Sequence, residues 1–253
     1  PDMPESVRAA MGKAAVDAAK ASGDEGAGTV EFIVDGSGAL RPDGFWFMEM
    51  NTRLQVEHPV TEAITGLDLV ELQLRVAAGE ALSFTQDDLA INGHAFEARL
   101  YAEDAEAGFL PVTGTLTHLR FPQGTVFENG AIRVDAGVRA GDEITPHYDP
   151  MIAKLIVHGP DRPPALRQLS RALADTRGAG TVTNLGFLKR LADHPGFAAG
   201  EVDTGLIGRH IDALTARDPA DYTRSHQAAA LTALGAAKAT TERGPCDMQT
   251  GWR

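Results

Sequence analysis

The sequence has a single cysteine, Cys246, which excludes an internal disulfide and is compatible with a reducing compartment. It has no excess of basic residues, and its formal net charge is −12 at pH 7. Because nucleic acids and anionic membrane surfaces attract basic proteins, we expect the chain to bind neither. No signal peptide and no apolar run of membrane length is present, which predicts a chain that folds in water.

The composition that remains is typical of a globular protein. The chain has 253 residues, of which 43% are hydrophobic and 23% are charged. This length is enough for one large domain or two small ones with their own cores. Segments with helical spacing alternate with segments that resemble antiparallel strands, so the sequence predicts an α+β fold.

The expected elements follow from periodicity and from turn residues. Helices are predicted over residues 7–21 and 60–79, and several more from residue 161 onward. Strands are predicted over residues 94–101, 113–121, 125–134 and 151–157. Near the end we predict an alanine-rich helix over residues 228–240 and a linker over residues 241–247.

Most of the polar candidates lie in residues 45–59. The stretch begins with the bulky run Phe45 to Met48, which we expect to be buried. If the whole stretch is extended, side chains two apart share a face. That face would carry Glu49, Asn51, Arg53, Gln55 and Glu57. A solvated strand face also produces such alternation, so the row alone does not define a site.

A second carboxylate strengthens the functional interpretation of this row. Residues 29–35 also resemble a strand, and the glycine-rich stretch between the two strands predicts a hairpin. If Asp35 pairs with Phe45, the register places Glu31 opposite Glu49. Facing carboxylates repel unless a cation lies between them. Two carboxylates and the Asn51 amide suit Mg²⁺, or Mn²⁺, as oxygen ligands.

The sequence also resembles a known family. Residues 49–62 (EMNTRLQVEHPVTE) closely resemble the signature of biotin carboxylases, which are ATP-grasp enzymes that carboxylate biotin with ATP and bicarbonate. The resemblance continues through further motifs and covers about residues 1–212. These motifs lie at residues 97–104, 109–111, 147–154 and 183–184.

The resemblance implies a domain organisation. Residues 1–92 would be the C-terminal part of an ATP-grasp domain, an antiparallel sheet with helices. Residues 93–216 would be a biotin carboxylase C-terminal domain, and residues 217–253 a helical linker with the start of a following domain. The glycine-rich lid of the family lies earlier in its sequences and has no match here. We therefore interpret the chain as the C-terminal half of the enzyme and expect it to be inactive alone.

The resemblance also implies roles for the row of polar residues. Glu31, Glu49 and Asn51 would hold Mg²⁺ at the terminal phosphates of ATP. Arg53 would present a planar fork to bicarbonate. Gln55 and the backbone amide of Val56 would complete that pocket. Glu57 would be the general base.

Two further roles concern the residues after this row. Arg99 shares a strand face with Glu97, and a surface ion pair between them would explain it without any function. The resemblance instead places Arg99 beside the reacting biotin and bicarbonate. Asp149 would orient Arg99, with simple turn chemistry as the alternative interpretation. His58 is interpreted as a hydrogen-bonded turn residue before Pro59.

The implied cofactors are ATP, Mg²⁺ or Mn²⁺, and biotin attached outside this chain. The implied partners are bicarbonate, a carboxybiotin carrier domain and a carboxyltransferase subunit, in an oligomer that is cytoplasmic in bacteria or lies in the mitochondrial matrix. The sequences of these motifs most resemble those of the biotin-bearing subunit of methylcrotonoyl-CoA carboxylases. Propionyl-, acetyl- and geranyl-CoA carboxylases remain alternatives. So do a non-catalytic assembly module and, within the ATP-grasp class, a carbamoyl-phosphate synthase.

Overall fold

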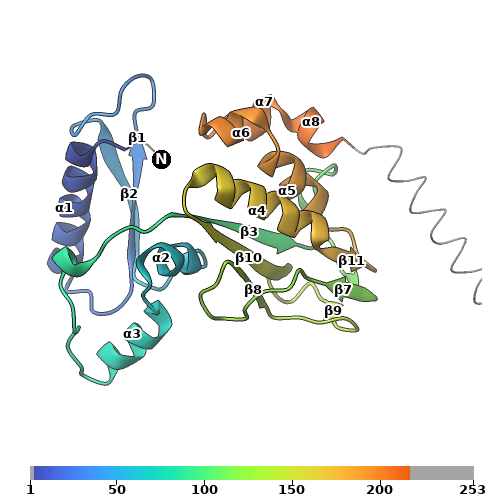
Figure 1. Ribbon diagram of the computed structural model, residues 1–253, viewed down its shortest axis with the longest axis horizontal. Helices are drawn as coiled ribbons and strands as arrows, with labels where there is room; N and C mark the ends of the chain where they lie inside the picture. Colours follow the sequence, from blue (N-terminus) through green and yellow to red (C-terminus); the bar gives the residue numbers. More distant parts are fainter. Residues whose placement is uncertain (1–2, 217–253) are drawn as a thin grey trace, which may run out of the picture. The chain divides into compact units, whose positions relative to one another are not determined.

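The structure is a computed structural model that describes residues 3–216 (Figure 1). Contacts divide the chain into two units, Pro1–His210 and Ile211–Arg253. The described part of the second unit holds helix α8 (Ile211–Thr215), in which the Thr215 hydroxyl donates a 2.8 Å hydrogen bond to the Ile211 carbonyl. The helix, the linker and the following domain that we predict within residues 217–253 lie outside the described residues.

The chain begins with a helix that packs against a two-stranded hairpin (Figure 1, blue). Helix α1 (Glu5–Ser22) ends at Gly23, whose φ of 66° lies in the left-handed region that glycine adopts without steric cost. Strands β1 (Thr29–Val34) and β2 (Phe45–Asn51) pair antiparallel, which confirms the predicted hairpin.

A bulge sets the register of this hairpin. Near the turn Val34 pairs with Phe45, so the predicted pairing of Asp35 with Phe45 is wrong by one residue. The register then shifts by one residue, because a bulge adds an unpaired residue to one strand. Beyond the shift Glu31 lies opposite Glu49, as predicted.

The aromatic end of β2 is exposed, so our prediction that this run is buried is wrong. Trp46, Phe47 and Met48 have exposed fractions of 55%, 59% and 58%. Among the described residues β2 pairs with β1 alone, so no third strand shields these side chains. Phe45 is partly covered through an edge contact with Phe32, at 5.2 Å between ring centroids.

The predicted helix over residues 60–79 is two helices. Helix α2 (His58–Thr65) ends at Gly66, which has a φ of 77°. Helix α3 (Leu69–Ala77) begins after Asp68, whose carboxylate accepts a 2.8 Å hydrogen bond from the Glu71 amide. A left-handed glycine followed by an N-cap aspartate stops one helix and starts the next. A short 3₁₀ turn at Gln86–Asp88 precedes the central sheet.

The central sheet is antiparallel with the strand order β3–β10–β8. Its strands are β3 (His94–Tyr101), β10 (Met151–Gly159) and β8 (Ile132–Ala136). The predicted strands over residues 94–101 and 151–157 are therefore confirmed. The strand predicted over residues 125–134 is wrong in its first half, where Thr125 forms only an isolated bridge to Arg133.

Small two-stranded sheets surround the central one, and the strand predicted over residues 113–121 is divided between two of them. The pairs are β4 (Glu103–Asp104) with β5 (Leu110–Pro111), β6 (Gly114–Thr115) with β9 (Glu143–Ile144), and β7 (His118–Arg120) with β11 (Arg177–Ala179).

The two faces of the central sheet differ in chemistry. One face is apolar, and helix α4 (Arg162–Asp175) covers it (Figure 1). Leu166, Leu169 and Leu173 of α4 join the strand residues in one buried cluster. The sheet contributes Ala98, Leu100, Val134, Leu155 and Val157 to that cluster. The other face carries charged residues and contacts α2.

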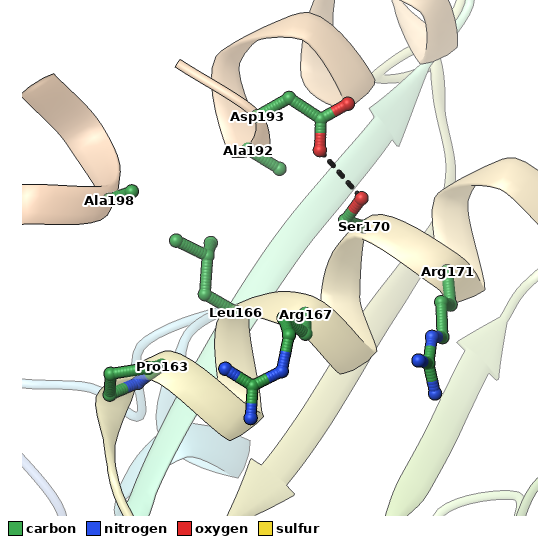
Figure 2. Close-up of a pocket in the computed structure, with 8 residues that line it drawn as sticks. All are labelled: Pro163, Leu166, Arg167, Ser170, Arg171, Ala192, Asp193 and Ala198. Atoms are coloured by element: carbon green, nitrogen blue, oxygen red, sulfur yellow. Dashed lines mark hydrogen bonds between the residues drawn. The ribbon is translucent and has the colours of Figure 1, made fainter. Parts of the chain in front are cut away.

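Three further helices follow, namely α5 (Leu185–Ala192), α6 (Pro195–Ala199) and α7 (Leu206–Arg209). A cavity of about 340 Å³ borders α4, α5 and α6, and in it the Ser170 hydroxyl donates a 2.6 Å hydrogen bond to Asp193 (Figure 2). No predicted site residue lines this cavity. Within residues 3–216, no helix is both long and apolar enough to cross a membrane.

Candidate active site

The three predicted metal ligands lie together on the hairpin. Glu31 of β1 faces Glu49 of β2, and Asn51 follows on the same face two residues later. The Asn51 side-chain amide donates to one oxygen of Glu31 over 3.1 Å and to one oxygen of Glu49 over 2.8 Å. The amide therefore links two carboxylates that would otherwise only repel one another.

This set fits a divalent cation by its donor type. The two carboxylates offer the hard oxygen atoms that Mg²⁺ and Mn²⁺ prefer, and rotation of the Asn51 side chain would turn its amide oxygen toward them. The part of the chain that the structure describes contains no group of three or more His, Cys, Asp or Glu arranged for a metal. A cation on Glu31, Glu49 and Asn51 would therefore keep coordination positions for water or phosphate, which is the usual way in which proteins bind Mg²⁺.

The row of side chains that alternation predicts beyond Asn51 is wrong. Strand β2 ends at Asn51, and Glu57 has φ −79° and ψ 8° immediately before helix α2. Helix α2 begins here because Pro59 occupies its first turn and His58 closes a turn onto the Gln55 carbonyl. Both the His58 backbone N–H and its ring Nδ1 bond to that carbonyl, at 3.2 and 2.8 Å.

A compact turn therefore presents the predicted bicarbonate residues. The Arg53 guanidinium donates a 3.0 Å hydrogen bond to the Gln55 side-chain oxygen. Gln55 and Glu57 line a cavity of about 390 Å³, which Gly28 and Thr29 border from the hairpin. The hairpin and the turn thus meet at one cavity, although the residues between them are not in a strand.

Arg99 joins this turn from the central sheet. Its guanidinium lies 2.5 Å from the Glu57 carboxylate, although the two residues are 42 positions apart in the sequence. Both side chains are accessible, with exposed fractions of 38% for Arg99 and 53% for Glu57. The predicted base and the predicted biotin-stabilising cation therefore meet at an open surface, where a substrate can reach them.

A third ionisable residue, Glu97, lies buried next to Arg99. The Glu97 side chain is 4% exposed, and its nearest cation is Arg99, with 3.6 Å between Nε and Oε1. Burial raises the pKa of Glu97 to about 7, against the opposing effect of the positive charges of Lys154 and Arg99. Glu97 therefore keeps its proton to a higher pH than an ordinary glutamate does.

Asp149 forms no described ion pair with Arg99. Its carboxylate accepts a 2.9 Å hydrogen bond from the Met151 amide, which is ordinary turn chemistry. Burial raises the pKa of the Tyr101 hydroxyl, and the negative charge of Asp149 raises it further. The ion pairs that the structure describes for Arg99 are with Glu57 and Glu97. A role for Asp149 in orienting Arg99 stays a prediction.

The sequence analysis missed a buried ionic layer between α2 and the sheet. Arg133 of β8 lies 2.7 Å from Glu62 of α2 and 2.8 Å from Asp135, and all three side chains are at most 5% exposed. Lys154 of β10 pairs with Asp135 in the strand register. One signal was available, because Lys154 is a lone cation inside the apolar run of a central strand.

Comparison with protein families divides the chain into two matched stretches. Residues 1–85 match the ATP-binding domain of the carbamoyl-phosphate synthase L chain, and residues 97–209 match the biotin carboxylase C-terminal domain. The first match alone would admit the carbamoyl-phosphate synthase alternative, and the second favours biotin carboxylase. The predicted boundary at residues 92/93 falls between the two stretches and stays a prediction.

Relatives span the same region of longer proteins. The mitochondrial methylcrotonoyl-CoA carboxylase subunit alpha of Dictyostelium discoideum is 49% identical over 252 residues, which cover 100% of this chain and 35% of the relative. The propionyl-CoA carboxylase alpha chain of Ruegeria pomeroyi is 50% identical over 222 residues, covering 82% and 32%. The chain thus spans about a third of the length of these relatives.

A solved structure shares both the fold and the sequence. The biotin carboxylase domain of 2-oxoglutarate carboxylase from Hydrogenobacter thermophilus, in complex with MgADP, ADP and bicarbonate, superposes with a TM-score of 0.78. It is 39% identical, and the match covers 85% of this chain and 46% of that one. The fold and the sequence thus place the chain among ATP-grasp proteins. Within that class, it belongs to the biotin carboxylase family.

Proposed function

We propose that this chain is the C-terminal half of a biotin carboxylase region and takes part in the ATP- and bicarbonate-dependent carboxylation of biotin. The observation that carries the proposal is the contact of Glu57 with Arg99, because it joins the turn before α2 to the central sheet at an accessible surface. An assembly module would have no need for an exposed base beside an exposed cation.

In the first step a bicarbonate oxygen attacks the γ-phosphorus of ATP, a new P–O bond forms, and the bond to ADP breaks to give carboxyphosphate. Arg53, Gln55 and the Val56 amide hold bicarbonate, and Glu57 accepts its proton. A divalent cation on Glu31, Glu49 and Asn51 would neutralise charge on the terminal phosphates.

In the second step the bond between the carboxyl carbon and the phosphate oxygen of carboxyphosphate breaks, the released phosphate takes the proton of the biotin ureido nitrogen, and that nitrogen bonds to the carboxyl carbon. The oxygen of the deprotonated ureido group becomes enolate-like, and the Arg99 guanidinium stabilises that negative charge. Arg99 lies against Glu57 before substrates bind. Binding of an anion beside the pair would therefore have to compete with the Glu57 carboxylate for the same guanidinium.

The proposal extends to the enzyme in which this region works. It assigns the chain to the biotin-bearing subunit of an acyl-CoA carboxylase of the methylcrotonoyl type, with a biotin carrier domain and a carboxyltransferase subunit as partners. The propionyl relative has a similar identity over a shorter match, 50% over 222 residues against 49% over 252, so the propionyl type is the second candidate. The relatives include mitochondrial proteins and bacterial ones, and we propose the matrix or the bacterial cytoplasm accordingly.

The substitution Glu57→Gln in the full enzyme tests the proposal. It keeps the size of the side chain and removes the base, so biotin-dependent ATP cleavage should fall by about 10²-fold or more. Phosphate release with ATP, Mg²⁺, bicarbonate and free biotin is the measurement. Glu71→Gln, which removes an exposed ion pair with Arg75 within helix α3, is the control. Near-normal turnover of Glu57→Gln would place the base elsewhere.

A further inference from the structure

The ammonium group of Lys154 lies beneath the turn that carries the proposed bicarbonate residues. Lys154 is on β10, the central strand, and its Nζ donates a 2.9 Å hydrogen bond to the Val56 carbonyl, 98 positions away in the sequence. The Lys154 side chain is only 12% exposed. It is therefore covered by the turn, whereas Glu57 and Arg99 above it are open to solvent.

Neutralising Asp135 does not account for this lysine. The Lys154 Nζ lies 3.8 Å from the Asp135 carboxylate, beyond hydrogen-bond distance. Asp135 is already satisfied by the Arg133 guanidinium, at 2.8 Å, and by the Phe127 amide, at 2.9 Å. The short contact of Lys154 is with the Val56 carbonyl, at 2.9 Å, and its charge also acts on the buried Glu97 carboxyl.

Apart from the ion pair of Glu57 with Arg99, the other described bonds of the turn lie within the turn itself. The Gln55 carbonyl is bonded within the turn by His58. The Arg53 side chain bonds to the Gln55 side chain and, over 3.5 Å, to the adjoining Leu54 carbonyl. The Val56 carbonyl belongs to the peptide that joins Val56 to Glu57. Holding this peptide plane fixes the Cα atoms of Val56 and Glu57, and so limits where the Glu57 side chain and the preceding Val56 N–H can lie.

Lys154 also fixes the turn relative to Arg99. Lys154 and Arg99 are direct partners in the ladder between β10 and β3, so the two cations share one sheet face. One holds the backbone of the turn, and the other contacts the carboxylate that the turn presents. The two halves of the proposed site are thus aligned on neighbouring strands.

We propose that Lys154 is a positioning residue for bicarbonate, which fixes the Val56–Glu57 peptide over Arg99 through its hydrogen bond to the Val56 carbonyl. This inference rests on the proposed function and deepens it. Lys154 would act through the backbone of the turn, to which its Nζ is bonded. Loss of its hydrogen bond should weaken bicarbonate binding by Gln55 and Val56 and misplace Glu57 as a base, without affecting the nucleotide.

The test is Lys154→Met in the full enzyme, which keeps most of the length of the side chain and removes the donor. We expect kcat/KM for bicarbonate to fall between about tenfold and a hundredfold, the usual range for a misplaced reacting group. The KM for ATP should stay within about twofold of wild type. Lys154→Arg keeps the charge and a donor, so it should recover part of the loss.

Leu169→Ala on the opposite, apolar face of the sheet is the matched control, because it lowers the thermal midpoint without touching the turn. It should leave the KM for bicarbonate unchanged. An unchanged kcat/KM for bicarbonate in Lys154→Met would overturn the inference, as would an equal rise of both KM values. If Lys154→Met does not fold, Lys154→Gln, whose shorter side chain withdraws the donor from the Val56 carbonyl, decides by the same two criteria. If the wild-type enzyme shows no biotin-dependent ATP cleavage, the proposed function itself fails.

Discussion

The hairpin and the polar face of the central sheet both place carboxylates side by side. The group that lies between the carboxylates differs in the two places. On the sheet, Glu62 and Asp135 share the Arg133 guanidinium, and all three side chains are buried. On the hairpin, Glu31 and Glu49 share only the neutral amide of Asn51. The ionic layer is complete as it stands, whereas the hairpin set has a surplus of negative charge.

This difference suggests two roles: the charges of the ionic layer stabilise the fold, and the carboxylates of the hairpin bind a ligand. The charge of a buried carboxylate beside a matched guanidinium is already neutralised, so such a carboxylate is not available to bind a substrate. An accessible pair of carboxylates without a cation gains most when a metal binds between them. Breaking the first set should therefore affect stability, and breaking the second should affect metal dependence.

The largest expected effect is in the ionic layer. Arg133→Ala leaves Glu62 and Asp135 buried without their cation, and the free energy of unfolding should fall by about 3–5 kcal/mol. Urea unfolding followed by circular dichroism measures it. Lys13→Ala, which removes the exposed ion pair of Lys13 with Asp17 on α1, should have almost no effect. Equal losses in the two variants would mean that the layer does not hold α2 to the sheet.

The ionic layer also marks the limit of what the sequence could predict. Alternation along β3 correctly places Glu97 and Arg99 on one face, because a strand has a fixed period of two. It cannot indicate which distant element covers that face. The contacts of Arg133 with Glu62 and of Lys154 with Val56 span 71 and 98 positions, so nothing local specifies them.

The hairpin shows how a correct pairing and a wrong extension arise from the same reasoning. Glu31 faces Glu49 as predicted, although a bulge compensates for an error of one residue at the turn. The same alternation fails for Arg53, Gln55 and Glu57, because helix α2 starts where the strand was expected to continue. The Pro59 that follows His58 was a helix-start signal, and the strand pattern outweighed it.

The second expected effect is a pH dependence of stability caused by the buried carboxyl of Glu97. The pKa of Glu97 is about 7 in the folded protein and is near 4.5 for an unfolded chain. The folded state therefore binds this proton more tightly. Its contribution to stability is complete below pH 4.5, is lost as pH rises through 7, and amounts to about 3 kcal/mol.

Glu97→Gln stays neutral at every pH and should abolish that loss. The variant should equal wild type near pH 4.5 and exceed it in stability at pH 8.5. The charges that face Glu97 are Arg99 on its own strand, Lys154 on β10 and Glu57 before α2. None of them changes in the variant. Unfolding free energies measured from pH 4.5 to 8.5 check this, and parallel curves for the two proteins would contradict it.

Substitutions in the hairpin should have the smallest effect on the free energy of unfolding. They should have the largest effect on the metal concentration that ATP cleavage requires. Glu31→Gln and Glu49→Gln each replace one of two facing carboxylates with a neutral amide of the same size. Removing the repulsion should leave the free energy of unfolding unchanged or slightly higher. In the full enzyme, the Mg²⁺ or Mn²⁺ concentration for half-maximal ATP cleavage should rise by about tenfold or more, because one anionic ligand is lost.

The comparison with the ionic layer depends on this result. Asp43→Asn, in the exposed loop between β1 and β2, is a matched control that removes one carboxylate from the same hairpin without removing a proposed ligand. Titrating ATP cleavage with each metal, beside urea unfolding of the same variants, separates the two roles. If both glutamine variants keep the metal dependence of the wild type, Glu31 and Glu49 do not bind the cation. If they instead lower stability as Arg133→Ala does, these carboxylates hold the fold, and the distinction between the two regions is wrong.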